Sequence, residues 1–207
     1  MREVELKSVV DDLAARRKEV ERSAGKPEFV GRLIDKRYDT PGGDLVQRDL
    51  VLRLRVYERD GEKHGHLDWK GATKYEGGYK VREEISTSIG DPDTLAAILG
   101  SLGFRVVREV EREIAQYSVA GATVRFERYP RMDDLVEVEG SPDTIEKAIA
   151  ITGLPREGFS SWRLANFVAD FERRTGLRAA ISAREFRGEY LFLDSSAVSA
   201  SDSGGIE

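Results

Sequence analysis

The residues best suited to chemistry in this sequence are acidic and basic side chains that recur at every second position. The chain opens with Glu3, Glu5 and Lys7 alternating with apolar residues. Because successive side chains of a β-strand point to opposite faces, these three charged groups would share one face. The same alternation recurs in Arg53 and Arg55, in His66, Asp68 and Lys70, in Lys80, Arg82 and Glu84, in Arg125 and Glu127, and in Glu137 and Glu139. The pattern predicts either a solvated sheet face or a charged site.

A solvated sheet is the simpler explanation, since an antiparallel sheet with one face in water alternates in this way. Two details favour a charged site. Arginine recurs at neighbouring positions with few Ser, Thr or Gln residues between them, and paired glutamates occur on the first and last long strands. If the sheet closes, these two strands become neighbours. Four carboxylates would then converge into an all-oxygen site for one or two divalent cations, namely Glu3, Glu5, Glu137 and Glu139.

The predicted inward face carries more positive than negative charge. The basic side chains are Lys7, Arg53, Arg55, Lys70, Lys80, Arg82, Arg112 and Arg125, and the acidic ones are Glu3, Glu5, Glu84, Glu127, Glu137 and Glu139. With a divalent cation added, such a cavity would attract an anion. Arginine forks match phosphate oxygens bidentately and a carboxylate-held metal bridges phosphates, so a polyphosphate fits better than a carboxylic acid or a sugar.

The elements that must position these side chains are strands separated by turn residues and by helices. We predict strands over 2–7, 28–40, 49–63, 65–71, 77–88, 105–119, 123–130 and 134–140. Apolar residues at helical spacing predict amphipathic helices over 10–23, 91–103, 141–153 and 160–176. About eight strands is in the range that antiparallel closure into a barrel requires.

Composition limits the classes of protein that fit. The 207 residues are 40% hydrophobic and 34% charged, and no apolar run approaches the roughly 20 residues of a membrane helix. There is no cysteine and no apolar leader, which predicts a cytoplasmic protein. His64 and His66 lie beside a turn and are predicted to face solvent, so a metal would be held mainly by carboxylates. A net charge of -5 argues against a nucleic-acid coat.

Several motifs, taken in order, make the sequence resemble the CYTH family, the triphosphate tunnel metalloenzymes that include class IV adenylyl cyclases and thiamine or inorganic triphosphatases. They are EVELK at 3–7, DKRYDTP at 35–41, LRLR at 52–55, DWKG at 68–71, VREEI at 81–85, LGSLGFRVV at 99–107, VEVEG at 136–140 and SSWRLANF at 160–167. The resemblance implies an α+β fold, in which a closed eight-stranded antiparallel β-barrel has a charged lumen and helices packed outside. It implies a triphosphate-tunnel domain over 1–176 and a partly disordered C-terminal extension over 177–207.

The resemblance also implies roles for individual residues. The metal ligands, for Mg²⁺ or Mn²⁺, would be Glu3, Glu5, Glu137 and Glu139, with a contribution from Glu127. The triphosphate would be bound by Arg53, Arg55, Lys70, Lys80, Arg82, Arg112 and Arg125. Lys7 is the candidate for polarising or activating the attacking group. The sequence departs from the family at one pair of positions. Where the family has a Lys-x-Arg pair, this sequence has Arg112 and Ile114, so the second basic residue is lost. Arg108 lies too far along the strand to be assigned as its replacement.

Two reactions and one binding role are compatible with these expectations. Hydrolysis of a triphosphate, whether inorganic tripolyphosphate, a nucleoside triphosphate or thiamine triphosphate, needs no base pocket and ranks first. Cyclisation of ATP to cyclic AMP and pyrophosphate, the class IV adenylyl cyclase reaction, is a close alternative. A non-catalytic polyphosphate-binding module is the third, favoured by Ile114 and opposed by the complete set of four glutamates. We expect the partner to be a small-molecule triphosphate and expect no association with a membrane. A homodimer is left open.

Overall fold

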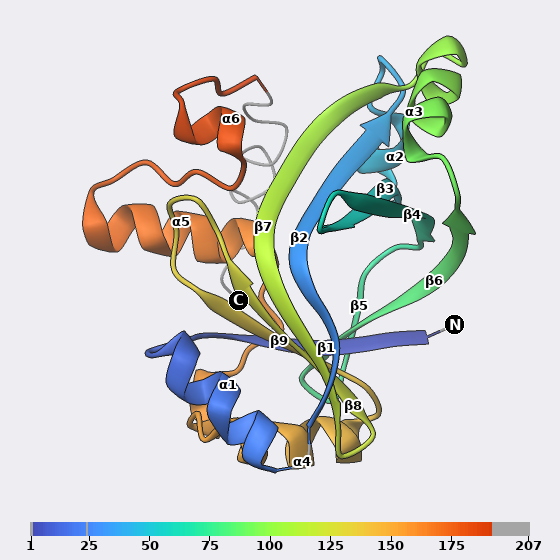
Figure 1. The fold of residues 1–207 in the computed structure, drawn as a ribbon. Coiled ribbons are helices and arrows are strands. Elements are labelled where there is room, and N and C mark those ends of the chain that lie inside the picture. Colours follow the sequence, from blue (N-terminus) through green and yellow to red (C-terminus); the bar gives the residue numbers. More distant parts are fainter. Residues whose placement is uncertain (1, 24, 192–207) are drawn as a thin grey trace, which may run out of the picture.

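Nine strands form one antiparallel sheet in the computed structural model, which describes residues 2–23 and 25–191. They are β1 (Arg2–Val9), β2 (Lys26–Asp39), β3 (Val51–Arg59), β4 (Glu62–Lys70), β5 (Lys74–Glu76), β6 (Tyr79–Ile89), β7 (Arg105–Val119), β8 (Ala122–Arg128) and β9 (Leu135–Glu139). The order is β1-β9-β8-β7-β2-β3-β4-β6-β5, and β1 also pairs with β6 (Figure 1). Eight strands therefore close into the predicted barrel. The short β5, which was not predicted, pairs only with β6.

The main apolar core lies outside the barrel wall, between the strands and the helices. Leu6 of β1, Val124 of β8 and Val138 of β9 are each at most 1% exposed. They belong to one apolar cluster with Ile145 and Ile149 of α4 (Pro142–Thr152). Because the side chains of a strand alternate, packing these apolar residues outward turns their charged neighbours toward the lumen.

The four predicted helices are all present with slightly different ends. They are α1 (Leu13–Arg22), α3 (Pro92–Ser101), α4, and α5 (Leu164–Thr175). Asp12, Asp91 and Ser141 cap the first three, because each side chain accepts a backbone N–H of the first turn. Three short elements were not predicted, namely α2 (Asp44–Gln47), the 3₁₀ helix η1 (Arg156–Gly158) and α6 (Ala183–Phe186). No helix in the described part of the chain is long and apolar enough to cross a membrane.

Residues 177–191 pack against the barrel beyond the end of α5. Ala180 forms an antiparallel bridge with Arg131, and the carbonyl of Ile181 accepts the backbone N–H of Glu111 at 2.7 Å. Ala180 and Ile181 are 0% and 4% exposed. Ordered packing therefore continues past residue 176, where the sequence analysis ended the domain. The remainder of the proposed extension, residues 192–207, lies outside the described residues.

Candidate active site

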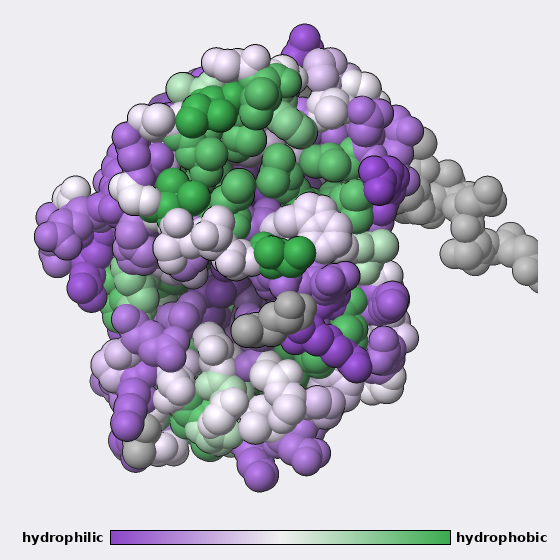
Figure 2. All heavy atoms as spheres, turned by 90° about the vertical axis from the view of Figure 1, so that its right-hand side faces the viewer, coloured by the Kyte–Doolittle hydropathy of each residue, from purple (hydrophilic) through white to green (hydrophobic). Residues whose placement is uncertain are grey.

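The barrel encloses a cavity of about 430 Å³ that is lined mostly by charged residues. Figure 2 shows a hollow near the middle of one face, lined by hydrophilic residues, while hydrophobic residues gather above it. The alternating charges of the sequence therefore face an enclosed lumen. Its lining includes every residue for which the sequence analysis predicted a metal-binding, triphosphate-binding or catalytic role.

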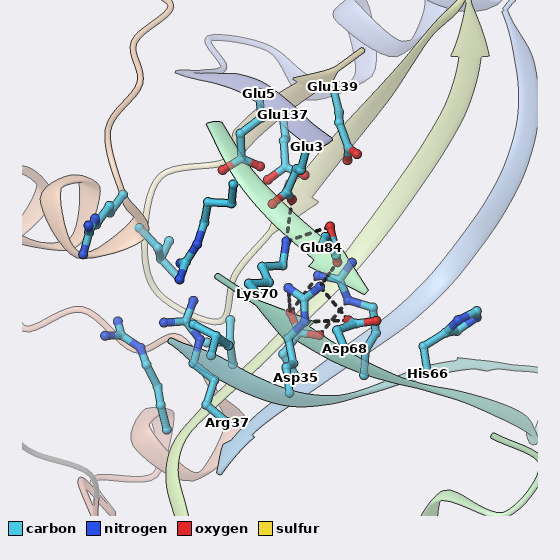
Figure 3. A pocket seen from close by; sticks show the side chains of 18 of the residues that line it. Glu3, Glu5, Asp35, Arg37, His66, Asp68, Lys70, Glu84, Glu137 and Glu139 are labelled. Atoms are coloured by element: carbon cyan, nitrogen blue, oxygen red, sulfur yellow. Dashed lines mark hydrogen bonds and ion pairs between the residues drawn. The ribbon is translucent and has the colours of Figure 1, made fainter. Parts of the chain in front are cut away.

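Four glutamates from β1 and β9 share one wall of the cavity, and we call Glu3, Glu5, Glu137 and Glu139 the glutamate wall. The antiparallel register places Glu5 opposite Glu139 and Lys7 opposite Glu137. Glu3 lies two residues before Glu5 and so points to the same face of β1. Figure 3 shows the four carboxylates grouped on one side of the pocket. Closure of the barrel through β1 thus brings together residues that are far apart in the sequence.

Three members of the glutamate wall pair with basic side chains. Lys70 forms an ion pair with Glu3, and Lys80 forms one with Glu5. Glu137 forms ion pairs with Lys7 and with Arg125. No three Asp, Glu, His or Cys side chains within residues 2–23 and 25–191 are arranged to hold a metal ion. The wall supplies the oxygen atoms, but a complete set of metal ligands requires some of these ion pairs to exchange.

Two features show that the glutamate wall fits a cation. Glu3 Oε2 is buried and has no hydrogen-bond partner among the described atoms. Glu139 has no hydrogen bond or ion pair with any described residue. Burial, together with the charges of Glu3 and Glu5, raises the pKa of the Glu139 carboxyl above its usual value. A hard divalent cation with oxygen ligands, such as Mg²⁺ or Mn²⁺, would offset this repulsion.

Glu127 of β8 has a different environment from the glutamate wall. Its Oε1 accepts hydrogen bonds from Nε of Arg112 at 2.9 Å and of Arg125 at 3.0 Å, and its Oε2 accepts the Tyr129 hydroxyl at 2.7 Å. Burial alone would raise the pKa of Glu127, but the two guanidinium groups hold that pKa far below its usual range. Both oxygens are thus engaged, so Glu127 orients two arginines, and this geometry gives no support to its predicted metal role.

Three of the arginines predicted to bind a triphosphate lie on the lumen side and pair with aspartates. Arg53 donates to Asp68 at 2.7 Å, and Arg55 donates to Asp35 at 2.8 Å. Arg112 also reaches Asp35, at 3.1 Å. The sequence analysis gave Asp35 and Asp68 no role, although both stand at the same period-two positions as lumen-facing basic residues. Their carboxylates hold the guanidinium groups in place and reduce the free positive charge of the cavity.

Arg82 of β6 is held by backbone carbonyls. Its Nε donates to the carbonyl of Gly71 at 2.6 Å, and its Nη2 donates to that of Asp49 at 2.5 Å. The Asp49 carboxylate in turn accepts from Arg163, just before α5, at 3.1 Å. Asp49 and Arg163 also line the cavity and were not identified from the sequence. The Asp49 carboxylate lies 4.0 Å from Nη2 of Arg82, so the charge of Arg82 is compensated less closely than that of an arginine bonded directly to a carboxylate.

Lys7, the candidate catalytic residue, projects between two members of the glutamate wall. Its Nζ contacts Glu137 and lies 3.7 Å from Glu5. Burial lowers the pKa of Lys7 to about 8, although Glu5 and Glu127 favour its charged form. The backbone of Lys7 is fixed by a pair of hydrogen bonds with Ser160, of 2.9 and 2.8 Å, so the segment before α5 holds this end of β1 in position.

Two further arginines, Arg37 of β2 and Arg108 of β7, line the cavity and were not assigned from the sequence. The signal for Arg37 was present, because it follows Asp35 at a spacing of two within the DKRYDTP motif. Arg108 stands four residues before Arg112 on the same strand. The register across β2 and β7 places Arg37 directly opposite Arg108. Only the pairing of these strands reveals that the two side chains are neighbours.

Ile114, the departure from the expected Lys-x-Arg pair, is a buried residue of β7. It lies opposite Glu127 of β8 and is 4% exposed. Ile114 is absent from the residues that line the cavity, whereas Arg112 is among them. The apolar side chain is thus accommodated in packed surroundings and presents no charge to the lumen.

A second cavity of about 450 Å³ adjoins the first and is rich in aromatic rings. The two share Tyr57, His66 and Gln116 as lining residues. Tyr57 stacks on His64, with ring centroids 5.0 Å apart and planes within 5°, and Phe29 meets Tyr57 edge-on. His64 is exposed, as predicted, but His66 is partly buried and reaches the main cavity.

Residues 1–151 of the chain match the CYTH domain family. No curated protein matches the sequence. Solved structures share the fold. A candidate adenylate cyclase from Vibrio parahaemolyticus superposes with a TM-score of 0.69 at 18% identity, covering 81% of this chain and 97% of that one. The PH1819 protein of Pyrococcus horikoshii OT3 gives 0.66 at 25% identity, covering 81% and 98%.

A plant protein with a measured activity has the same fold. HpAC1 of Hippeastrum, a candidate adenylyl cyclase that has a dominant triphosphatase activity, superposes with a TM-score of 0.59 at 18% identity. The match covers 84% of this chain and 95% of that one. At this identity the likeness shows a shared fold and leaves the reaction to be argued from the cavity.

Proposed function

The chain belongs to the CYTH family, and we propose that it hydrolyses a triphosphate within its barrel, with the help of a divalent cation. One observation carries the proposal, which is the meeting of the glutamate wall with basic side chains inside a single cavity. Carboxylates suit a hard cation, and lysine and arginine suit phosphate oxygens, so a metal-bound polyphosphate satisfies both sets of charges.

We assign the cation, Mg²⁺ or Mn²⁺, to the glutamate wall. A metal bound there would neutralise phosphate charge and act as a Lewis acid on a phosphoryl oxygen. Binding requires Glu3 and Glu5 to turn from Lys70 and Lys80 toward the cation. The two released ammonium groups would then be available to phosphate oxygens. Exchange of ion pairs in this way keeps the buried charges compensated with and without substrate.

The basic residues of the lumen would orient the phosphate chain. The hydrogen-bond acceptors of Arg82 are backbone carbonyls, so more of its charge is available to phosphate than that of an arginine bonded to a carboxylate. Arg125 joins the glutamate wall to Glu127, so it connects the cation side with the phosphate side. In hydrolysis, a water oxygen attacks the terminal phosphorus and loses a proton, while the bond from that phosphorus to the bridging oxygen breaks. The terminal phosphoryl group becomes orthophosphate, and the diphosphate portion of the substrate is the leaving group. We propose that Lys7, beside Glu137, polarises or activates the attacking water.

Cyclisation of ATP is the second candidate, because the second cavity offers aromatic rings next to the charged lumen. The exposed His64 ring stacks on Tyr57, and Tyr57 lines both cavities. An adenine base could stack there while its triphosphate extends inward, since base stacking on aromatic side chains is favourable. Hydrolysis remains the first choice because it needs no fixed base and no placement of the ribose 3′-hydroxyl.

The test is a product assay with purified protein. Tripolyphosphate, ATP and thiamine triphosphate would be incubated separately with Mg²⁺ or Mn²⁺ and with EDTA. Metal-dependent release of orthophosphate supports hydrolysis, and cyclic AMP with pyrophosphate supports cyclisation. Tight binding of a triphosphate without any product would refute both reactions and leave a binding module.

A further inference from the structure

Most basic side chains of the cavity have an anionic or carbonyl partner. Ion pairs or hydrogen bonds hold Lys7, Arg53, Arg55, Lys70, Lys80, Arg82, Arg112, Arg125 and Arg163. Arg37 and Arg108 differ. Neither forms an ion pair or hydrogen bond with any described residue, although both line the cavity. We call these two residues the arginine pair.

The arginine pair lies where like charges are concentrated. Arg37 stands directly opposite Arg108 on one side and Arg53 on the other. Like charges directly opposite each other on neighbouring strands are destabilising. Burial, together with the charges of Arg108 and Arg53, lowers the pKa of Arg37 to about 9, and the charge of Asp35 opposes this shift. The ligand-free protein therefore carries an uncompensated cluster of positive charge.

The cluster lies across the cavity from the carboxylates. In Figure 3, Arg37 is on the side of the pocket opposite the glutamate wall. Glu185 of α6 is the acidic residue that acts most on Arg108, and no ion pair joins them. Opposite charges are therefore separated across the lumen. Among the described residues, carboxylate oxygens of Glu3 and Glu139 lack a partner on one side, and the two guanidinium groups of the arginine pair lack one on the other.

We propose that the arginine pair is a phosphate subsite, which clamps the phosphate group of the substrate that lies farthest from the glutamate wall. The inference rests on the proposed function for the identity of the substrate, and it adds how the substrate is oriented. Two guanidinium forks can present several N–H donors to one phosphate group. The arginine pair would hold the end of the phosphate chain that points away from the glutamate wall.

The test measures tripolyphosphate binding by calorimetry in protein treated with EDTA, so that no turnover is needed. We expect Arg37→Gln and Arg108→Gln each to weaken binding about tenfold or more, as for the loss of a charge-assisted hydrogen bond. Arg105→Gln is the matched control, because Arg105 lies on β7 like Arg108, but is exposed and does not line the cavity. It should change the affinity less than about twofold, the scale of a surface substitution.

A double variant shows whether both side chains act on one phosphate. If they do, the combined loss of affinity will be smaller than the product of the two single losses, because either change already disrupts the clamp. Independent, multiplicative losses, or unchanged affinity in both single variants, would overturn the subsite. The melting temperature of each ligand-free variant should be equal to or above that of the unchanged protein, since a repelled charge is removed. If Arg37→Gln does not fold, Arg108→Gln still supplies the comparison.

Steady-state kinetics separates this inference from the proposed reaction. Tripolyphosphate binding that depends on the arginine pair, without turnover, would support the subsite and refute hydrolysis. Turnover with the same KM in the unchanged protein, Arg37→Gln and Arg108→Gln would support hydrolysis and refute the subsite.

Discussion

Glu139 differs from the rest of the glutamate wall because no basic side chain in the described part of the chain pairs with it. Its pKa is raised by burial and by the neighbouring carboxylates, so its negative charge costs free energy in the metal-free protein. We predict that Glu139→Gln lowers metal-dependent turnover by more than about tenfold, an effect that even outer residues of metal sites can produce. The melting temperature without metal should not fall, because the substitution removes repulsion and leaves no cation unpaired.

The matched control for this prediction is Glu113→Gln, an exposed glutamate of β7 outside the cavity. Both variants would be assayed for phosphate release over a range of Mn²⁺ concentrations. Full activity of Glu139→Gln at every concentration would contradict its assignment to the metal site.

Arg53 combines a structural role with its predicted role in binding. Its guanidinium group lies 2.7 Å from Asp68, which is 2% exposed, and 3.7 Å from Asp35. Arg53→Ala would leave the buried Asp68 without its cationic partner, so we predict a loss of about 3–5 kcal/mol in the free energy of unfolding. Asp35 would keep Arg55 and Arg112. Urea denaturation measures this loss. Tripolyphosphate affinity at a temperature where the variant is folded should also fall.

Arg16→Ala is the control for Arg53, because Arg16 lies on α1 outside the barrel and bonds Asp11 and the carbonyl of Gly153. We predict only small changes in stability and triphosphate affinity for this variant. Equal effects of the two substitutions on affinity would show that Arg53 has no special place in binding.

At the scale of elements, β1 is the strand that both closes the barrel and carries Glu3, Glu5 and Lys7. It pairs with β6 on one side and β9 on the other. Its outward Leu6 is 1% exposed in the apolar core against α4. We predict that Leu6→Ala lowers the free energy of unfolding by about 2–5 kcal/mol, as cavity-forming substitutions do.

Val9→Ala tests whether this loss is specific to the packed part of β1. Val9 belongs to the same strand but is 39% exposed, so its truncation should cost much less. Chemical denaturation of both variants gives the comparison. Similar losses for the two would indicate that the core under β1 contributes little to closure of the barrel.

At the scale of the whole molecule, a cavity filled with buried ion pairs makes stability depend on pH. Burial alone would raise the pKa of Asp35, but Arg55, Arg53 and Arg112 hold it well below its usual range. The folded protein therefore keeps Asp35 ionised at a pH low enough to protonate the same carboxylate in the unfolded chain. This contribution to stability is complete above about pH 4, the ordinary pKa of an aspartate, and is lost as the pH falls toward the lower folded value.

We predict that the melting temperature declines as the pH falls below about 4, the range set by the ordinary aspartate pKa. Asp35→Asn should show a weaker decline between pH 4 and pH 2, since it lacks this carboxyl group. Circular dichroism melting curves would check both. Identical pH profiles for the variant and the unchanged protein would contradict the role given to the buried aspartate.

Assembly as a homodimer and a cytoplasmic location stay predictions from the sequence.

The sequence by itself determined the strand alternation, the four main helices and the membership of β1 and β9 in one charged site. These features were predictable because they depend on local periodicity and on capping residues such as Asp91 and Ser141, which act within a few positions of the chain. The motifs that resemble the CYTH family predicted the barrel, which is confirmed, and the roles of its charged residues, which stay predictions. Short elements such as β5 and α6 were missed because too few residues carry the pattern.

Only the tertiary structure decided which charges meet. Asp35 and Asp68 neutralise arginines that the sequence analysis assigned to phosphate, while Arg37 and Arg108 have no such partner within residues 2–23 and 25–191. These outcomes depend on cross-strand register between residues far apart in the chain, and a shift of one residue would turn each side chain to the other face. Periodicity therefore predicts that a side chain faces the lumen, and strand pairing determines whether its charge is compensated there.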